Sequence, residues 1–393
     1  MTPPPIPIAK PWMDEREVEA ARRPISKGWV TQGPEVAAFE AEFAQAVGAP
    51  HACAVSNCTT ALHLALLAAG VRPGDEVITV SHSFVATASS IRYCGALPVF
   101  VDVERATFNM DPRAIGPAVS PRTRAILAVH QMGMPCDILG ILDIAARHSL
   151  PVIEDAACAA GSEILRNGAW ERIGKPHGDI ACFSFHPRKL LTTGDGGMLT
   201  TANSAYDARF RAQRQHGMSV PDTVRHSSDK VIFEEYPEMG YNYRMTDIQA
   251  AMGREQIKKL PEIVARRRYL ASRYRQILAG IEGLELPAEP GWARTNWQSF
   301  CVRLPEACRQ AAVMQTLLDR GIATRRGIMN AHRERAYPEG TWRPGGSLAE
   351  SEAAQDRCII LPLFHQMTAE EQDRVAAILA EAVSASVVTR SSA

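Results

Sequence analysis

Lys189 lies in the run SFHPRKLLTTGDGGMLTT, which extends from Ser184 to Thr201. An apolar, strand-like segment at 180–185 precedes the lysine, and a glycine-rich turn at 194–197 leads into a second apolar run. An amine that is partly shielded from water has a lowered pKa, because desolvation penalises the ammonium form, and it can then form a Schiff base with a carbonyl. The run therefore predicts either a nucleophilic lysine between two strands or a solvated lysine in a surface loop.

The segments around this run alternate between short apolar stretches and helix-like stretches, which predicts βαβ units and an α/β fold with a mainly parallel central sheet. Ligands of such sheets bind beyond the carboxyl ends of the strands. Because a long charged helix runs through Arg275, we expect a large domain over residues 1–255, with an N-terminal arm, and a smaller C-terminal α+β domain over 256–393. The expected strands are 51–56, 76–80, 97–102, 125–130, 151–154 and 180–185, and the expected helices are 59–69, 86–94 and 138–148.

The composition argues against several kinds of partner. Forty-three Lys and Arg balance forty-three Asp and Glu, and the longest basic cluster is Arg266-Arg267-Arg268, so we expect no nucleic-acid partner. The nine cysteines form no CxxC pair, which predicts neither a disulfide framework nor a metal site and suits the reducing cytosol. The N-terminus lacks the features of a signal peptide, and no apolar run reaches the roughly 18 residues of a membrane span. We therefore expect a cytoplasmic protein without a membrane partner.

The segment SNCTTALHLALLAAG places Ser56, Asn57, Cys58 and Thr59 between an expected strand and an expected helix. The first amides of a helix have no partner within it and, with the helix dipole, they favour an anion such as a phosphate. An ordinary helix cap, made by Asn57 or Thr59, is the alternative.

Three further side chains lie at or after the ends of expected strands. Asp155 ends the strand in LPVIEDAACAAGS, and a buried carboxylate needs a cation, such as a protonated pyridine nitrogen. The hydroxyl of Ser184 can donate to a phosphate, and Phe84 in SHSFVATAS can stack on an aromatic ring. Alternatively, Asp155 caps a helix or binds a metal, and Phe84 packs in the core. Together with Lys189, the set fits pyridoxal phosphate (PLP) better than other cofactors.

From end to end, the chain resembles the PLP-dependent aminotransferases of the DegT/DnrJ/EryC1/StrS family, which act on keto sugars and related ketones. The resemblance implies a type I, aspartate aminotransferase-like PLP fold. It is carried by GWVTQGPEVAAFE, SNCTTALHLALLAAGVRPGDEVI, SFVATASSI, VFVDVERATFNMDP, VIEDAA, SFHPRK with GDGG, GYNYRMTDIQAA and LPLFHQMT.

This resemblance also implies roles for single residues. Lys189 carries the cofactor as a Schiff base and then moves the substrate proton, while Asp155 pairs with the pyridine nitrogen. Asn242, in GYNYRM, reaches the phosphate of the neighbouring subunit's cofactor, which implies a homodimer with shared active sites. The other cofactor contacts that the resemblance implies are Cys58 through its amide, Thr59, Phe84, Cys158 and Ser184.

Two positions depart from the family pattern. Cys58 stands where the family usually has glycine, so the close approach of backbone to phosphate requires that its side chain turn away. Cys158 stands where Gln or His commonly contacts the ring hydroxyl, and a thiol is a weak hydrogen-bond donor.

The expected reaction moves an amino group from glutamate or glutamine to a nucleotide-linked 3- or 4-keto-6-deoxyhexose. A cyclitol ketone is the second candidate acceptor, and a non-catalytic regulatory or sensory protein on the same fold is the alternative from another class. A PLP-dependent sugar dehydratase, with histidine in place of the lysine, is disfavoured by Lys189. Candidate substrate residues in GIATRRGIMNAHRERAY are Arg325, Arg326, His332 and Tyr337, although either arginine could be ordinary surface charge.

Overall fold

Eight strands form the central sheet of the computed structural model, which describes residues 4–391. Their order is β1-β9-β8-β5-β4-β2-β3-β13, and β9 alone runs opposite to the other seven. The expectation of a mainly parallel sheet is thus confirmed. The strands are β1 (His51–Val55), β2 (Glu76–Val80), β3 (Leu97–Val101), β4 (Thr123–Val129), β5 (Val152–Asp155), β8 (Ile180–Ser184), β9 (Gly197–Thr201) and β13 (Arg343–Pro344).

Helices cover both faces of this sheet, because its strands alternate their side chains between two apolar cores. On β2, for example, Ile78 and Val80 pack on one side and Val77 on the other. The first core includes α2 (Pro34–Val47), α5 (Ile115–Ala118), α6 (Ile138–His148) and the first part of α9 (Asp247–Leu278). The second includes α3 (Cys58–Ala68), α4 (Ala86–Tyr93) and α7 (Ser204–Gln213). Helix α1 (Glu15–Lys27) packs on α9.

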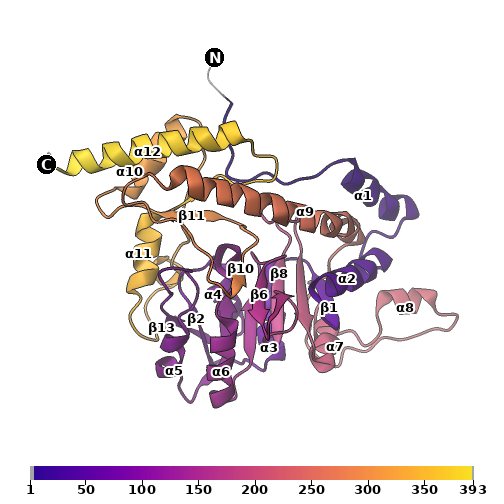
Figure 1. Ribbon diagram of the computed structural model, residues 1–393. Coiled ribbons are helices and arrows are strands. Elements are labelled where there is room, and N and C mark those ends of the chain that lie inside the picture. The colour runs from indigo at the N-terminus through magenta and orange to yellow at the C-terminus, as the bar shows by residue number, and fades with distance from the viewer. Residues whose placement is uncertain (1–3, 392–393) are drawn as a thin grey trace.

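A smaller group of elements packs beside the central sheet, at the top of the view in Figure 1. Its sheet has the order β11-β14-β12, and its core is shared with α9, α10 and α12. The N-terminal segment joins this group, since Ile6 is buried in its core and donates its amide hydrogen to Gly321 O over 2.8 Å. These elements are β11 (Phe300–Arg303), α10 (Gln310–Asp319), β12 (Arg325–Arg326), α11 (Ala349–Arg357), β14 (Cys358–Leu361) and α12 (Ala369–Ser391).

Helix α9 links the two cores. Ile257 and Val264 pack with the larger core, whereas Leu270 and Leu278 pack with the smaller one. The division into domains at residues 255 and 256 falls inside this helix and stays a prediction. A third sheet consists of β6 (Glu163–Arg166), β7 (Ala169–Arg172) and β10 (Ala293–Arg294), and Ile164 of β6 packs in the larger core. The short helices are α8 (Asp222–Ser227), η1 (Pro112–Ala114), η2 (Gln131–Gly133) and η3 (Ala331–Arg333).

Parallel strands bring the segments that follow them to one edge of the sheet. The carboxyl ends of β1, β2, β5 and β8 and the amino end of β9 meet there. This edge therefore gathers residues 56–59, 81–87, 155–158, 184–189 and 194–197. Among the described helices, none has the length and apolar composition needed to span a membrane.

Candidate active site

Lys189 follows β8, and its side chain is half-buried. Its Nζ donates a hydrogen bond to Cys158 Sγ over 3.0 Å. Burial acts to lower the pKa of Lys189, but Cys158, Cys58 and Asp155 outweigh burial, and the pKa is raised. The sequence-based expectation of a lowered pKa is therefore wrong, because sulfur and carboxylate groups near the amine stabilise its ammonium form.

Asp155 is the last residue of β5 and is buried. Its Oδ2 accepts a hydrogen bond from Thr87 Oγ1 over 2.7 Å, and its Oδ1 accepts one from the amide of Ala157 over 3.2 Å. Burial raises the pKa of Asp155, and the Thr87 hydrogen bond opposes that rise. Within residues 4–391, no arginine, lysine or histidine forms an ion pair with this carboxylate, so it suits a cationic ring nitrogen.

Glu154, the neighbour of Asp155, is engaged elsewhere. Its Oε2 lies 2.8 Å from His130 Nε2, and both side chains are fully buried. The amide of Cys136 donates to His130 Nδ1, which leaves Nε2 to carry the proton toward Glu154. Of the two adjacent carboxylates, Asp155 is therefore the one that faces the Lys189 side of the sheet edge.

The start of α3 offers two free amides. Asn57 caps the helix, since its Oδ1 accepts from the amide of Thr60 and its carbonyl accepts from the amide of Ala61. In the described part of the chain, the amides of Cys58 and Thr59 have no hydrogen-bond acceptor, so the helix cap leaves these two donors free for an anion. The Cys58 side chain is buried in the apolar core beside α3.

Gly197 lets α3 approach the strand that carries Ser184. The two residues are opposite one another in the β8–β9 pairing. A Cβ atom on Gly197 would lie 2.5 Å from the carbonyl carbon and oxygen of Asn57, closer than any side chain allows. The Ser184 hydroxyl, which accepts a hydrogen bond from the amide of His186 over 3.4 Å, therefore lies beside the helix start. Together they form a cradle suited to a phosphate.

Phe84 and Asn242 are both exposed at this edge. Phe84, just before α4, is 58% exposed, so its ring is available for stacking. Asn242 pairs with Gln215, and the next residue, Tyr243, accepts a hydrogen bond from the amide of Ser56 over 2.8 Å. The segment that carries Asn242 thus lies against the loop between β1 and α3 of its own subunit.

The four candidate substrate residues divide into two pairs. Arg325 and Arg326 are exposed on β12, and Arg326 forms an ion pair with Glu334 at 3.1 Å. No hydrogen bond within residues 4–391 joins any of the four to Lys189 or Asp155.

His332 and Tyr337 contact the segment around Phe84 instead. His332 Nδ1 lies 2.6 Å from Ser81 Oγ, and the Tyr337 hydroxyl lies 2.8 Å from Ser89 Oγ. These serines flank Phe84 in the sequence. The two side chains therefore support the position of Phe84, a role that the sequence did not indicate.

Sequence reasoning also missed Thr87 and Ser83. Ser83 Oγ lies 2.7 Å from Thr87 Oγ1, so a chain of hydroxyls leads to Asp155. The run SHSFVATAS could have indicated them, because Ser83 and Thr87 both lie within three residues of Phe84.

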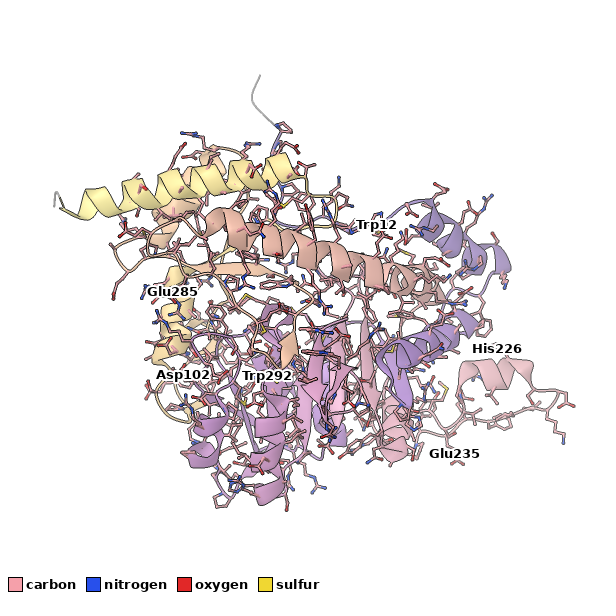
Figure 2. All side chains as sticks on the ribbon, viewed as in Figure 1. Trp12, Asp102, His226, Glu235, Glu285 and Trp292 are labelled. Atoms are coloured by element: carbon pink, nitrogen blue, oxygen red, sulfur yellow. The ribbon has the colours of Figure 1, made fainter. Side chains whose placement is uncertain are left out.

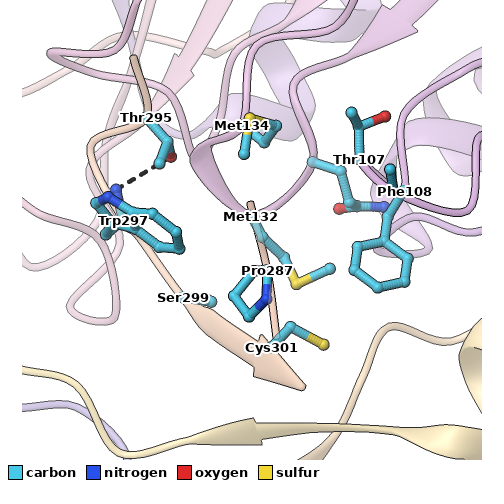
Figure 3. Close-up of a pocket in the computed structure, with 11 residues that line it drawn as sticks. Thr107, Phe108, Met132, Met134, Pro287, Thr295, Trp297, Ser299 and Cys301 are labelled. Carbon is cyan, nitrogen blue, oxygen red and sulfur yellow. Dashed lines mark hydrogen bonds between the residues drawn. The ribbon is translucent and has the colours of Figure 1, made fainter. Parts of the chain in front are cut away.

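A small pocket with a cavity volume of about 20 Å³ is lined by residues that include Thr107, Pro287 and Cys301 (Figure 3). Asn296, which lies in the sequence between the lining residues Thr295 and Trp297, donates to the carbonyls of Cys158 and Ala160. None of the expected cofactor residues lines this pocket. Its lining includes Phe108, Met132 and Trp297, all with positive φ.

The chain matches known proteins over nearly its whole length. A model of the DegT/DnrJ/EryC1/StrS aminotransferase family matches residues 11–380. The aminotransferase TlmJ from Streptoalloteichus hindustanus is 32% identical, with a TM-score of 0.87 over 97% of this chain and 99% of TlmJ.

Two other solved structures are similar. DesI, solved with its TDP-sugar product, is 29% identical, with a TM-score of 0.88 over 99% of this chain and 95% of DesI. The putative sugar aminotransferase Spr1654 from Streptococcus pneumoniae, in its PMP form, is 25% identical, with a TM-score of 0.90 over 97% of this chain and 100% of Spr1654. Given these matches and the arrangement of Lys189 and Asp155, the chain belongs to the DegT/DnrJ/EryC1/StrS aminotransferase family and is a PLP-dependent aminotransferase.

Proposed function

We propose that this enzyme transfers an amino group from glutamate or glutamine to a nucleotide-linked 3- or 4-keto-6-deoxyhexose in the cytoplasm. The observation that carries the proposal is the position of Asp155, which is buried and forms no ion pair among the described residues. It lies at the same sheet edge as Lys189 and the free amides of α3. The sugar class is supported by DesI, whose structure holds a TDP-sugar product. The nine free cysteines suit a reducing compartment.

The residues of the site fit PLP. Asp155 would hold the pyridine nitrogen protonated, and the amides of Cys58 and Thr59, with the Ser184 hydroxyl, would hold the phosphate. Phe84 would stack on the ring. When bound, PLP supplies a conjugated ring that accepts the electron pair left on the substrate carbon.

Lys189 would have two roles. It is the covalent attachment point for the cofactor and, once released by the amino donor, it is the amine placed to move a proton to and from the substrate carbon. A positioned base of this kind contributes about 10²–10⁴-fold to the rate. Lys189→Ala should therefore abolish turnover and leave the protein folded.

A second copy of the chain would complete the site. Residues 218–240 form an arm that extends from the body, as the labelled His226 and Glu235 show in Figure 2. The arm exposes Val231 (84%), Phe233 (87%) and Met239 (82%), which a lone subunit would leave in water. Because Asn242 follows directly, we propose that the arms pack in a homodimer with shared active sites.

A hybrid dimer tests the shared site. Lys189→Ala and Asn242→Asp each inactivate their own homodimer, yet a co-expressed hybrid should regain up to half of the wild-type activity, because one of its two sites keeps both residues. Hybrids that stay inactive would contradict the sharing of Asn242 across the dimer.

The substrate assignment is tested with protein loaded with pyridoxamine phosphate. It is mixed with nucleotide-linked 3-keto and 4-keto sugars and, separately, with inososes, and the return of the lysine-bound cofactor band is followed. Recovery with a nucleotide-linked keto sugar supports the proposal, whereas recovery with inososes alone replaces it with a cyclitol aminotransferase. A protein that never binds PLP would favour a sensor.

A further inference from the structure

We propose that Cys158 and Lys189 are an oxidation-sensitive pair, in which hydrogen peroxide turns the contact between thiol and amine into a covalent sulfur–nitrogen bond. The two atoms already touch, since Lys189 Nζ donates to Cys158 Sγ over 3.0 Å. Peroxide oxidises the thiolate form of a cysteine, and the resulting sulfenic acid reacts with a nucleophile within reach.

The backbone on both sides of this contact is fixed. Asn296 Nδ2 donates to the carbonyls of Cys158 and Ala160, each over 2.8 Å. The amide of Lys189 donates to the carbonyl of His186 over 2.8 Å. The approach of sulfur to nitrogen is therefore built into the fold, because neither residue lies on a free loop.

Cys158 is also the accessible thiol at the site. Seven of the nine cysteines are buried, and only Cys158 and Cys308 are partly exposed. Burial raises the pKa of both Cys58 and Cys182 well above its usual range, which keeps these two neighbouring thiols protonated and inert. Cys308 lies in the smaller group of elements, where its Sγ is 3.7 Å from Val383 O. Among the described residues, Cys158 alone combines exposure with a hydrogen bond from a lysine amine.

The reaction balances with hydrogen peroxide as the oxidant. The Cys158 thiolate attacks one peroxide oxygen, so that an S–O bond forms as the O–O bond breaks, and the departing hydroxide takes a proton from the Lys189 ammonium to become water, which leaves Nζ neutral. The lone pair of neutral Lys189 Nζ then attacks the sulfur of the sulfenic acid. An S–N bond forms as the S–O bond breaks, and the second oxygen leaves with the amine proton as a second water. The sulfur loses two electrons, and the peroxide gains them.

The bond would occupy the nitrogen that carries the cofactor. This consequence rests on the proposed function, whereas the cross-link itself does not. Bound PLP should protect the pair, because it engages Nζ. A thiol reductant should reverse the bond, because thiolate sulfur displaces nitrogen at the sulfenamide sulfur. Oxidation would thereby stop the enzyme without destroying it.

The test is peptide mapping of the full chain after peroxide treatment, once saturated with PLP and once stripped of it. We expect a cross-linked peptide that joins residues 158 and 189, at least tenfold more abundant in the stripped protein and lost on dithiothreitol treatment. Cys158→Ser should abolish this peptide, and the matched variant Cys308→Ser should retain it. Lys189→Arg should instead leave a sulfenic acid on Cys158 that dimedone labels. Absence of the cross-link in stripped wild-type protein, with Cys158 still reduced or fully oxidised to sulfinic acid, would overturn the proposal.

The same samples separate this inference from the proposed function. A cross-link that forms equally with and without PLP, in a protein that shows no lysine-bound cofactor band, would remove the cofactor assignment and leave the oxidation-sensitive pair standing. A normal cofactor band without any cross-link would remove the oxidation-sensitive pair and leave the cofactor assignment standing.

Discussion

Thr87 Oγ1 donates a hydrogen bond to Asp155 Oδ2 over 2.7 Å, and it thereby ties the first helix after β2 to the end of β5. The bond acts against the effect of burial, which raises the pKa of Asp155. Hydrogen bonds to charged groups contribute about 1.5–3 kcal/mol. Thr87 therefore helps to keep a buried carboxylate ionised, as a partner for a cationic ring requires.

Asp155→Asn should stabilise the cofactor-free protein while it removes activity. Because the folded-state pKa of Asp155 is raised, its stability contribution is present below the unfolded value of about 3.8 and is lost as the pH rises through the folded pKa. The side-chain amide that the substitution introduces does not ionise, so the variant has no such loss. We therefore expect Asp155→Asn to raise the free energy of unfolding by about 1 kcal/mol at pH 7 and to leave it unchanged at pH 3.5. Thermal unfolding at both pH values measures this, and Asp195→Asn, at an exposed carboxylate, is the control. An equal gain at both pH values would contradict the explanation.

Gly197→Ala should weaken cofactor binding. The added Cβ would lie 2.5 Å from the Asn57 carbonyl and 2.8 Å from the Cys58 nitrogen, and these backbone atoms cannot move without shifting the start of α3. We expect the Kd for PLP to rise at least about tenfold, which corresponds to about 1.4 kcal/mol. Absorbance titration measures this, and Gly116→Ala, which has open space around its Cβ position, should bind PLP normally.

Tyr337→Phe should affect stability more than substrate binding. It removes the hydroxyl that lies 2.8 Å from Ser89 Oγ, which should cost about 1 kcal/mol of unfolding free energy. Ser89→Ala should cost a similar amount, and the double variant should cost little more than either single one. Urea unfolding and the KM for the keto sugar are the measurements. A KM that rises tenfold at unchanged stability would instead place the hydroxyl on the substrate.

Arg267→Met should be strongly destabilising. This buried side chain on α9 donates to the carbonyls of Trp297 and Gln298 over 2.7 and 2.8 Å, and burial lowers its pKa to about 9. Because each hydrogen bond from a charged donor contributes about 1.5–3 kcal/mol, we expect a loss of about 3 kcal/mol or more in urea unfolding. Arg275→Met, at an exposed position of the same helix, should stay within about 0.5 kcal/mol of wild type.

Local patterns in the sequence were sufficient for most of the large sheet. Strand β2 and helix α6 have the expected bounds, because a short run rich in β-branched residues and a capped amphipathic stretch each specify their own conformation. The hairpin of β6 and β7 and the two-residue strands β12 and β13 were not expected. Their sequences are short and partly exposed. Strands β6 and β7 pair with each other across a tight turn, whereas β12 and β13 are strands only through pairing with the distant strands β14 and β3.

The sequence by itself indicated the fold class and the residue types of the site, because Lys189, Asp155, Ser184 and the start of α3 each lie at or just after the end of a short apolar run of strand length. The tertiary structure alone decided what surrounds them. It placed Cys158 against Lys189, Thr87 against Asp155, and the two candidate substrate residues His332 and Tyr337 against serines around Phe84. These contacts join segments that lie tens to hundreds of residues apart. No local pattern encodes them, because burial and neighbouring charge at such a contact depend on how the whole chain packs.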